Sequence, residues 1–320
     1  HSFDAYIFGT TATPDDAYEF AKGSAIFHPL GYEMQIREPL DFYAVTDHGM
    51  LLGMVEHWAD PNNGKAGSEP FHNLNSPENI TQESVAARSL LFQDYVRNTT
   101  NFSNIWTRFM ALITGDTARG TTLFDVNVHR TAWADIIKSA QRHNDPGNFT
   151  TFVAYEYTTS TTRSSNTEGA SQLKCLLRGT GCNFQGSPPL ESANLHRNVI
   201  YNGNKFTVEP FSRLKSLNPE DLWSWMDGLR ERGVDTIAIP HNSNGSNGQM
   251  FEMENWEGLP ISTQYAEFRM RNEPIVEMTQ VKGTSETHPI LSPNDEWADF
   301  EIMDQRVGNS AYSRPFGGYV

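Results

Sequence analysis

The sequence is poor in cysteine and in basic residues, and it contains no long apolar run. Cysteine occurs only twice in 320 residues, and the closely spaced cysteine pair of a zinc finger is absent. No stretch approaches the roughly 20 consecutive apolar residues that a transmembrane helix needs, so we expect no membrane span. The P-loop, the dinucleotide fingerprint and the Gly-x-Ser-x-Gly elbow are also missing, which argues against nucleotide hydrolases of that class, nicotinamide enzymes and serine hydrolases.

Charge limits the possible partners. Lysine and arginine number 24 against 39 aspartate and glutamate residues, which gives a formal net charge of -15. Such a charge repels phosphate backbones and anionic lipid surfaces, so nucleic acid is not an expected partner. The acidity suits divalent cations, although composition by itself favours ordinary solubilising surface charge.

The two cysteines, Cys175 and Cys182, stand close together in a segment rich in turn residues. They are either joined in a disulfide or are two unrelated thiols, and their proximity favours the disulfide. A disulfide indicates an oxidising compartment, so we predict a periplasmic or secreted protein. The chain begins at His1 without an initiator methionine, which suits a processed or truncated polypeptide.

Helix and strand signals alternate along the chain. Capping residues and apolar spacing predict helices at 14–22, 84–97, 104–113, 131–143 and 219–232. Runs of β-branched, aromatic and other apolar residues predict strands at 40–45, 149–155, 199–201, 236–239 and 274–278. No sequence repeat accompanies this alternation, so we predict one α/β domain over residues 1–320, either a barrel or a parallel sheet.

Two segments do not fit this alternation. Residues 61–83 are rich in Asn, Gly, Pro and Ser, which is typical of a long loop. Residues 158–193 have a similar composition and contain both cysteines. We expect this second segment to be a loop insertion that covers the site.

Four predicted strands end in residues that bind metals. The carboxyl ends of barrel strands share one mouth, so residues far apart in sequence meet there. Imidazole and carboxylate are the ligands that borderline and hard divalent ions prefer. The expected metal ligands are Asp47, His48, Glu156, His241, Glu277 and His288. Of these, Asp47 and Glu156 are also the expected catalytic residues, and a metal-bound hydroxide is the expected nucleophile.

Each ligand candidate has a structural alternative. Asp47 could cap a turn, and His48 could be a hydrogen-bonded core histidine. Glu156 follows an apolar strand, where a carboxylate needs a cationic partner, and an arginine would serve as well as a metal. Glu277 could be the polar face of an edge strand, and His288 could be a surface histidine.

Three further residues are candidates for substrate binding. His196 and Arg197 are adjacent, and the Arg197 guanidinium is suited to bidentate binding of an anion. A salt bridge between Arg197 and one of the many carboxylates is an equal alternative. Lys282 could contact a phosphate or sulfate oxygen, or could simply be a loop residue.

These residues lie in segments that resemble a known family. The resemblance covers residues 2–5, 8–11, 41–49, 154–158, 195–200, 239–244 and 276–295. They are similar to the bacterial proteins grouped as domain of unknown function 3604, distant relatives of the polymerase and histidinol phosphatase (PHP) superfamily. Thr46-Asp47-His48-Gly49 and Pro240-His241-Asn242 are the most specific of these segments.

The resemblance implies a distorted, PHP-like barrel of parallel strands with long loop insertions. It implies up to three metal ions, often manganese, zinc or iron, and hydrolysis of phosphoesters. The segment at Asp47 and His48 resembles the second metal motif of the superfamily, Glu156 its bridging carboxylate and His241 a later histidine ligand. His196 matches a further ligand.

The sequence departs from the superfamily pattern at both ends. The opening His-x-His motif is expected just before Ser2, where only His1 stands, and the closing Asp-x-His motif is absent before Val320. Either the chain is a piece of a longer protein or other residues replace the missing ligands.

The combined prediction is a metal-dependent hydrolase of a small-molecule phosphate or related ester. One rival is a hydrolase of sulfate, phosphonate or carboxylic esters. The other is a non-catalytic scaffold that kept the fold. The sequence predicts neither the substrate nor the oligomeric state.

Overall fold

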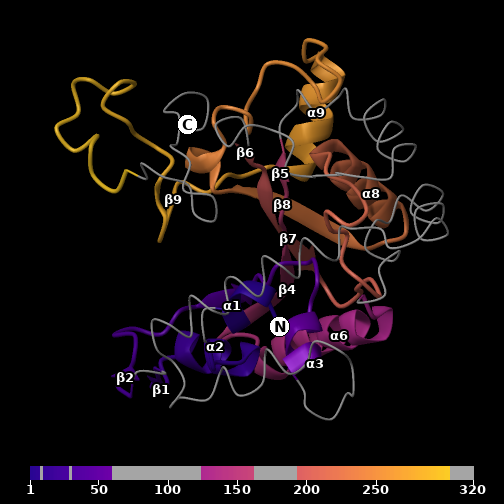
Figure 1. Ribbon diagram of the computed structural model, residues 1–320, viewed down its shortest axis with the longest axis vertical. Coiled ribbons are helices and arrows are strands. Elements are labelled where there is room, and N and C mark those ends of the chain that lie inside the picture. Colours follow the sequence, from indigo (N-terminus) through magenta and orange to yellow (C-terminus); the bar gives the residue numbers. More distant parts are fainter. Residues whose placement is uncertain (8–9, 29–30, 60–123, 162–192, 303–320) are drawn as a thin grey trace. The chain divides into compact units, whose positions relative to one another are not determined.

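The structure, a computed structural model, describes residues 1–7, 10–28, 31–59, 124–161 and 193–302 (Figure 1). The chain divides into two compact units. The first unit comprises His1–Tyr155 and Ile200–Leu214, and the second comprises Glu156–Val199 and Lys215–Val320. The boundary between them falls within two strands, β4 (Thr150–Tyr157) and β7 (His196–Asn202).

Helices predominate in the first unit. Besides its portions of β4 and β7, its described elements are α1 (Phe3–Ile7), α2 (Pro14–Ala21), β1 (Ile26–Phe27), β2 (Glu33–Met34), β3 (Phe42–Val45), α3 (Met54–Ala59) and α6 (Val126–His143). Helix α2 packs against both α6 and β3. The core includes Trp133, Tyr155 and Tyr201, whose rings contact one another with centroids 5.7 to 6.5 Å apart.

Helix α2 confirms the prediction made from its capping residues. Thr13 and Asp16 form a capping box in which each side chain accepts a hydrogen bond from the other residue's backbone N–H. Tyr18 is buried on the inner face, and its hydroxyl donates to the Phe152 carbonyl and accepts from the Val45 amide, both at 3.4 Å. Burial raises the pKa of Tyr18 to about 12. The helix is thereby joined to β3 and β4.

Helix α6 begins at Val126 rather than at the predicted Thr131. The Asp125 carboxylate accepts hydrogen bonds from the backbone of Asn127 and Val128, which satisfies two otherwise unpaired amides of the first turn. The β-branched residues Val126 and Val128 have weak helix propensity, so sequence pattern alone placed the start too late.

Asp15 gives the first unit a pH-dependent contact between α2 and α6. The Arg142 guanidinium, with further hydrogen bonds from Ser139 and His143, lowers the pKa of Asp15 from 3.8 to about 2. A lowered folded-state pKa contributes stability above pH 3.8 that is lost as the pH falls toward 2.

We therefore expect Asp15→Asn to destabilise the protein at pH 6 but not near pH 2. The side chain is 43% exposed, so solvent screening limits the effect to about 1 kcal/mol or less. Urea unfolding of both proteins between pH 6 and pH 2 measures this difference. The matched control is Asp135→Asn, which removes an exposed carboxylate of α6. A difference for Asp15→Asn that stays constant with pH would contradict the assignment.

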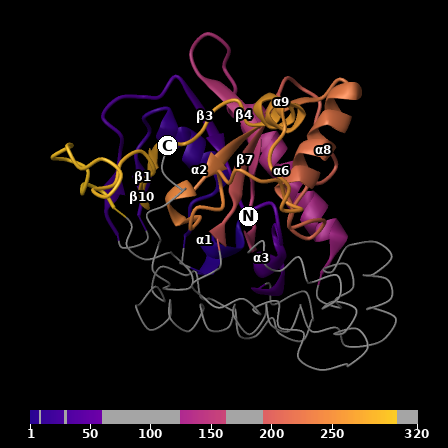
Figure 2. The ribbon, with the colours of Figure 1, turned by 90° about the horizontal axis from the view of Figure 1, so that it is seen from above.

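The second unit contains the later helices. Besides its portions of β4 and β7, its described elements are β5 (Ser160–Thr161), β6 (Ala193–Asn194), α8 (Pro219–Glu231), β8 (Asp235–His241), the 3-10 turn η5 (Ser243–Gly245), α9 (Thr263–Asn272), β9 (Thr279–Gln280) and β10 (Gly283–Thr284). Helix α8 contacts β8 and α9, and Figures 1 and 2 both show α8 and α9 side by side. Asn218 caps α8 as predicted, and Trp223 is fully buried on its inner face.

The strands confirm an α/β fold. The largest sheet has the order β3-β4-β7-β8, with β3 and β4 parallel from Phe42 opposite Thr150 to Val45 opposite Val153. The smaller sheets β1-β2, β5-β6 and β9-β10 are antiparallel. The strands in the described ranges do not close into a barrel, so the barrel and the single domain stay predictions.

Several strand predictions are corrected by the structure. Residues 274–278 form no strand, and Glu277 is instead held by side-chain contacts and one backbone bond to Pro240. The strand predicted at 40–45 is not buried, since Phe42 is 66% exposed. Strands β4 and β8 extend further than predicted and include Glu156 and His241 themselves.

The insertion at 158–193 begins and ends on paired strands. Ser160 lies opposite Asn194, and Thr161 lies opposite Ala193. Both cysteines and the predicted disulfide lie outside the described residues, as do the predicted loop at 61–83 and the predicted helices at 84–97 and 104–113. Among the helices that the structure describes, none has the length and apolar character needed to cross a membrane.

Candidate active site

In the second unit, two predicted site residues, His196 and His241, come together around a third, Glu156. This residue lies near the end of β4, His196 begins β7 and His241 ends β8. His196 Nδ1 lies 2.9 Å from Glu156 Oε1, and His241 Nε2 lies 3.8 Å from Glu156 Oε2. Thr158 donates a hydrogen bond of 2.9 Å to Glu156 Oε1. The side chain of Glu156 is only 9% exposed, so these hydrogen bonds help to offset the cost of burying its carboxylate.

Glu277 holds the ring of His241 in place. His241 Nδ1 lies 2.5 Å from Glu277 Oε2, and the Asn242 backbone N–H donates to Glu277 Oε1 at 3.2 Å. An ionised carboxylate only accepts hydrogen bonds, so His241 carries a proton on Nδ1. In the neutral ring, the lone pair then resides on Nε2, the nitrogen nearer Glu156.

Asn242 links the residues of this group. Its side-chain amide lies 3.3 Å from His196 Nδ1, and its Oδ1 accepts from Gln280 Nε2 at 2.6 Å. The backbone of Asn242 is left-handed, with φ 59° and ψ 38°, which asparagine tolerates better than most residues. Because the left-handed conformation directs the chain into η5, the residue after the strand both turns the chain and orients the imidazoles.

A second polar group lies in the first unit. His48 Nε2 is 2.9 Å from Asp4 Oδ2, and Phe3 stacks on the His48 ring with centroids 4.8 Å apart. Ser2 donates its hydroxyl to Asp4 Oδ1 at 2.5 Å and its backbone N–H to Asp47 Oδ1 at 3.0 Å. Burial alone would raise the pKa of Asp4, but hydrogen bonding and charge from His48 outweigh it and lower the pKa.

Asp47 differs from its neighbours because half of its carboxylate has no partner. Its Oδ2 atom is buried and accepts no hydrogen bond from the part of the chain that the structure describes. Burial is the largest influence on this group and raises the pKa of Asp47. An unpaired buried carboxylate oxygen is costly, and a bound cation or proton removes that cost.

The carboxylate oxygens and imidazole nitrogens of both groups are atoms of the kinds that bind divalent ions. Within the described ranges, no group of three or more His, Cys, Asp and Glu side chains is spaced to hold a metal ion. The donors occur as pairs instead. His241 Nε2 and Glu156 Oε2 lie 3.8 Å apart, which is short enough for each to lie about 2.0–2.2 Å from one ion. Glu277 then occupies the place of the carboxylate that orients a metal-binding histidine.

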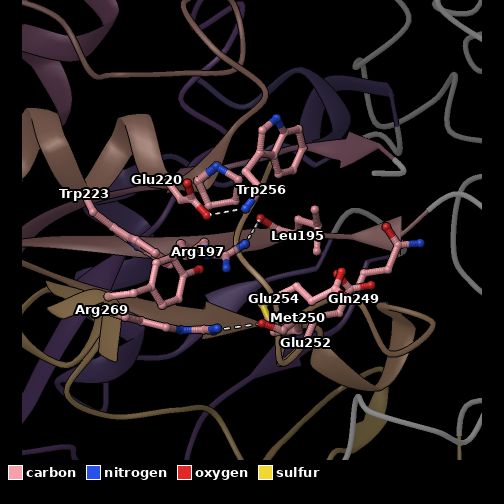
Figure 3. Close-up of a pocket in the computed structure, with 12 residues that line it drawn as sticks. Leu195, Arg197, Glu220, Trp223, Gln249, Met250, Glu252, Glu254, Trp256 and Arg269 are labelled. Carbon is pink, nitrogen blue, oxygen red and sulfur yellow. Dashed lines mark hydrogen bonds between the residues drawn. The ribbon is translucent and has the colours of Figure 1, made fainter. Parts of the chain in front are cut away.

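Arg197 forms a buried ion pair, the alternative left open by its sequence. Its Nε donates to Glu273 Oε1 at 2.7 Å, and Nη1 donates to the Leu195 carbonyl at 2.6 Å (Figure 3). Trp223 Nε1 donates to the same oxygen, and Arg269 binds the other one at 2.9 Å. Its role as an anion clamp stays a prediction.

The hydrogen bonds described for Lys282 and His288 involve nearby residues. Lys282 forms its hydrogen bonds through its backbone: its N–H donates to the Gln280 side chain, and its carbonyl accepts from the Asn244 side chain. His288 Nδ1 accepts from the Ile290 amide at 3.2 Å. Their predicted roles in binding substrate and metal stay predictions.

The sequence reasoning passed over several residues of these groups. Asp4 and Ser2 belonged to a segment that carried the family resemblance, and that was the signal that could have found them. Asn242 and Gln280 follow His241 and Glu277 in polar stretches that read as ordinary loops. Glu273 precedes a proline at the end of a helix, and no sequence pattern indicates its burial.

Comparison with known proteins identifies the family. Residues 1–168 and 180–319 match the family model described as Protein of unknown function (DUF3604). The chain belongs to the DUF3604 family. No curated protein and no solved structure was found to match it. The matched ranges include all the residues of the two polar groups, around Glu156 and around Asp47.

Proposed function

We propose that this DUF3604 protein is a metal-dependent hydrolase of a phosphate or related ester. The observation that carries the proposal is the arrangement around His241. Glu277 accepts a hydrogen bond from the Nδ1–H of His241, and Nε2 lies 3.8 Å from the carboxylate of Glu156. The lone pair of His241 Nε2 and the Glu156 carboxylate oxygen repel each other unless a cation or a second ring proton lies between them. A divalent ion between them would bind both atoms.

The residues divide into those that would hold the metal and those that would position them. Glu156 and His241 would hold an ion in the second unit, and Asp47 with His48 would hold one in the first, while His196 would position Glu156. The resemblance to PHP proteins supports manganese, zinc or iron, and it also supports a more complete barrel than the described strands form. A bound divalent ion supplies a Lewis acid and lowers the pKa of water.

The positioning residues limit the freedom of the ligands. Thr158 and His196 hold Glu156 Oε1, which leaves Oε2 directed toward the side of His241. Glu277 keeps the proton of His241 on Nδ1, so that Nε2 is the basic atom. These contacts lower the entropy lost when a ligand or metal binds, as in other preorganised sites.

The first experiment combines elemental analysis with a substrate panel. The full chain is loaded in turn with manganese, zinc and ferrous iron, desalted and analysed for bound metal. Hydrolysis is then measured with p-nitrophenyl esters of phosphate, phosphodiester, phosphonate, sulfate and acetate. We expect bound metal near stoichiometry and the fastest hydrolysis for a phosphate ester.

His241→Ala serves as the site variant and His28→Ala as the matched control. The ring of His28 stacks on that of Tyr32 in the first unit, with centroids 4.5 Å apart. We expect metal and hydrolysis to be lost in His241→Ala and retained in His28→Ala. Wild type that binds no divalent metal would favour the scaffold alternative. A preference for sulfate, phosphonate or acetate esters would favour the rival hydrolases.

A further inference from the structure

A pocket in the second unit is built from four segments of the chain (Figure 3). It has a volume of about 420 Å³ with its open mouth included. It is lined by β7 with the residue before it, by the start of α8, by residues 249–256 and by α9. Arg197 faces this pocket while the adjacent His196 contacts Glu156, because successive residues of a strand point to opposite faces. The pocket is therefore separate from the candidate active site.

Aromatic rings form much of the pocket lining. Trp223, Trp256 and Tyr265 line it, and Trp223 packs edge-on against Tyr265 with centroids 5.8 Å apart. The face of an aromatic ring carries partial negative charge and attracts cations. The protein already uses this attraction here, since the Arg269 guanidinium lies 5.4 Å from the Trp223 centroid and 5.3 Å from that of Phe251.

The charges around the pocket are mainly negative. Three carboxylates line it, Glu220, Glu252 and Glu254. The two lining guanidiniums, Arg197 and Arg269, are compensated from behind by the buried Glu273. Each guanidinium also donates to a backbone carbonyl, that of Leu195 or Met250. Carboxylates thus outnumber guanidiniums, which disfavours an anionic ligand.

One lining carboxylate is held rigidly at the pocket wall. Glu220 Oε1 accepts the Trp256 backbone N–H at 2.5 Å. Glu220 also hydrogen-bonds Tyr265, and burial together with this negative charge raises the pKa of Tyr265 to about 12. Glu220 therefore joins α8, the 249–256 segment and α9, and it places its carboxylate beside the Tyr265 ring and the backbone of Trp256.

We propose that this pocket binds a small organic ammonium ion. Aromatic faces and carboxylates together recognise a cation that carries apolar groups, because the rings contact its alkyl surface and both attract its charge. A neutral ligand of the same shape gains only the apolar contact. A hydrated inorganic cation gains little from the rings. This inference does not depend on the proposed hydrolase activity.

The test compares choline with its uncharged isostere, 3,3-dimethylbutan-1-ol. Saturation-transfer NMR on the full chain measures the binding of each compound through its methyl signals. We expect choline to bind with about tenfold higher affinity than the alcohol, the difference that a cation–π contact provides. Equal affinity of the two compounds, or no saturable binding of millimolar choline, would overturn the proposal.

Two variants and one control locate the binding. Trp256→Leu removes a lining ring, and Glu252→Gln removes a lining charge while retaining the shape of the side chain. Glu257→Gln is the same change at an exposed residue outside the lining. We expect the first two to weaken choline binding at least severalfold and the third to leave it unchanged, with thermal unfolding confirming that all three fold. Unchanged choline binding in both lining variants would refute this location. Repeating the choline titration in the presence of a chelator distinguishes binding in this pocket from binding at a metal site.

Discussion

Replacing Glu273 with alanine is expected to destabilise the protein by about 3–5 kcal/mol, because it leaves the buried guanidinium of Arg197 without its counterion. Both side chains of this pair are almost fully buried, at 2% and 1% exposure. Glu273 also accepts hydrogen bonds from Trp223 and Arg269, so three donors lose one acceptor together. Urea unfolding monitored by tryptophan fluorescence measures the loss.

Two variants test the physical reason for this effect. Glu267→Ala removes an exposed carboxylate from the same helix and is expected to change the stability by less than about 0.5 kcal/mol. The double variant Arg197→Met, Glu273→Leu removes both members of the pair and is expected to be more stable than Glu273→Ala, because no uncompensated Arg197 charge remains. A double variant no more stable than the single one would show that packing, rather than the unpaired charge, dominates.

The pH dependence of this pair has a definite sign. Burial alone would raise the pKa of Glu273, but Arg197 and Arg269 outweigh it and lower the pKa below the usual 4.5. The stabilisation is therefore complete above pH 4.5 and is lost as the pH falls through the lowered folded-state value. The stability difference between wild type and Glu273→Ala is expected to shrink on acidification.

Glu277→Gln is expected to lower metal affinity and hydrolysis by about 10–100-fold, the effect typical of removing a carboxylate that orients a histidine ligand. Glutamine keeps the size of the side chain and still accepts from the Asn242 amide, but it no longer supplies the charge that keeps the proton on His241 Nδ1. In the proposed site, Glu277 would thus be a positioning residue rather than the metal ligand predicted from the sequence. Metal titration by calorimetry and steady-state kinetics measure the two effects.

The control for this prediction is Glu286→Gln, an exposed carboxylate in the following segment. It is expected to leave metal binding and kinetics unchanged. A positioning role requires that raising the metal concentration restores part of the kcat of Glu277→Gln. If saturation with metal restores nothing while affinity is normal, Glu277 acts on the substrate rather than through His241.

The sequence predicted the local structure best where side chains of neighbouring residues determine it. The capping box of Thr13 and Asp16 and the Asn218 cap were readable because each is complete within four residues. The residues of the candidate site could be named because polar residues at strand ends are unusual. The prediction failed at 274–278, where an apolar run has the composition of a strand but no partner strand pairs with it in the described structure.

Only the tertiary structure decided which of these residues meet. Glu156 is 40 positions from His196 and 85 positions from His241, and Asp4 is 44 positions from His48. No local pattern encodes contacts over such separations. The sequence by itself determined the α/β class, the acidic character, the capped starts of α2 and α8 and the family, because these depend on composition and short-range spacing. Burial and the distances between segments are set only when the chain packs. They determine the ion pair of Arg197 and Glu273, the hydrogen bond between His241 and Glu277 and the proposed ammonium pocket.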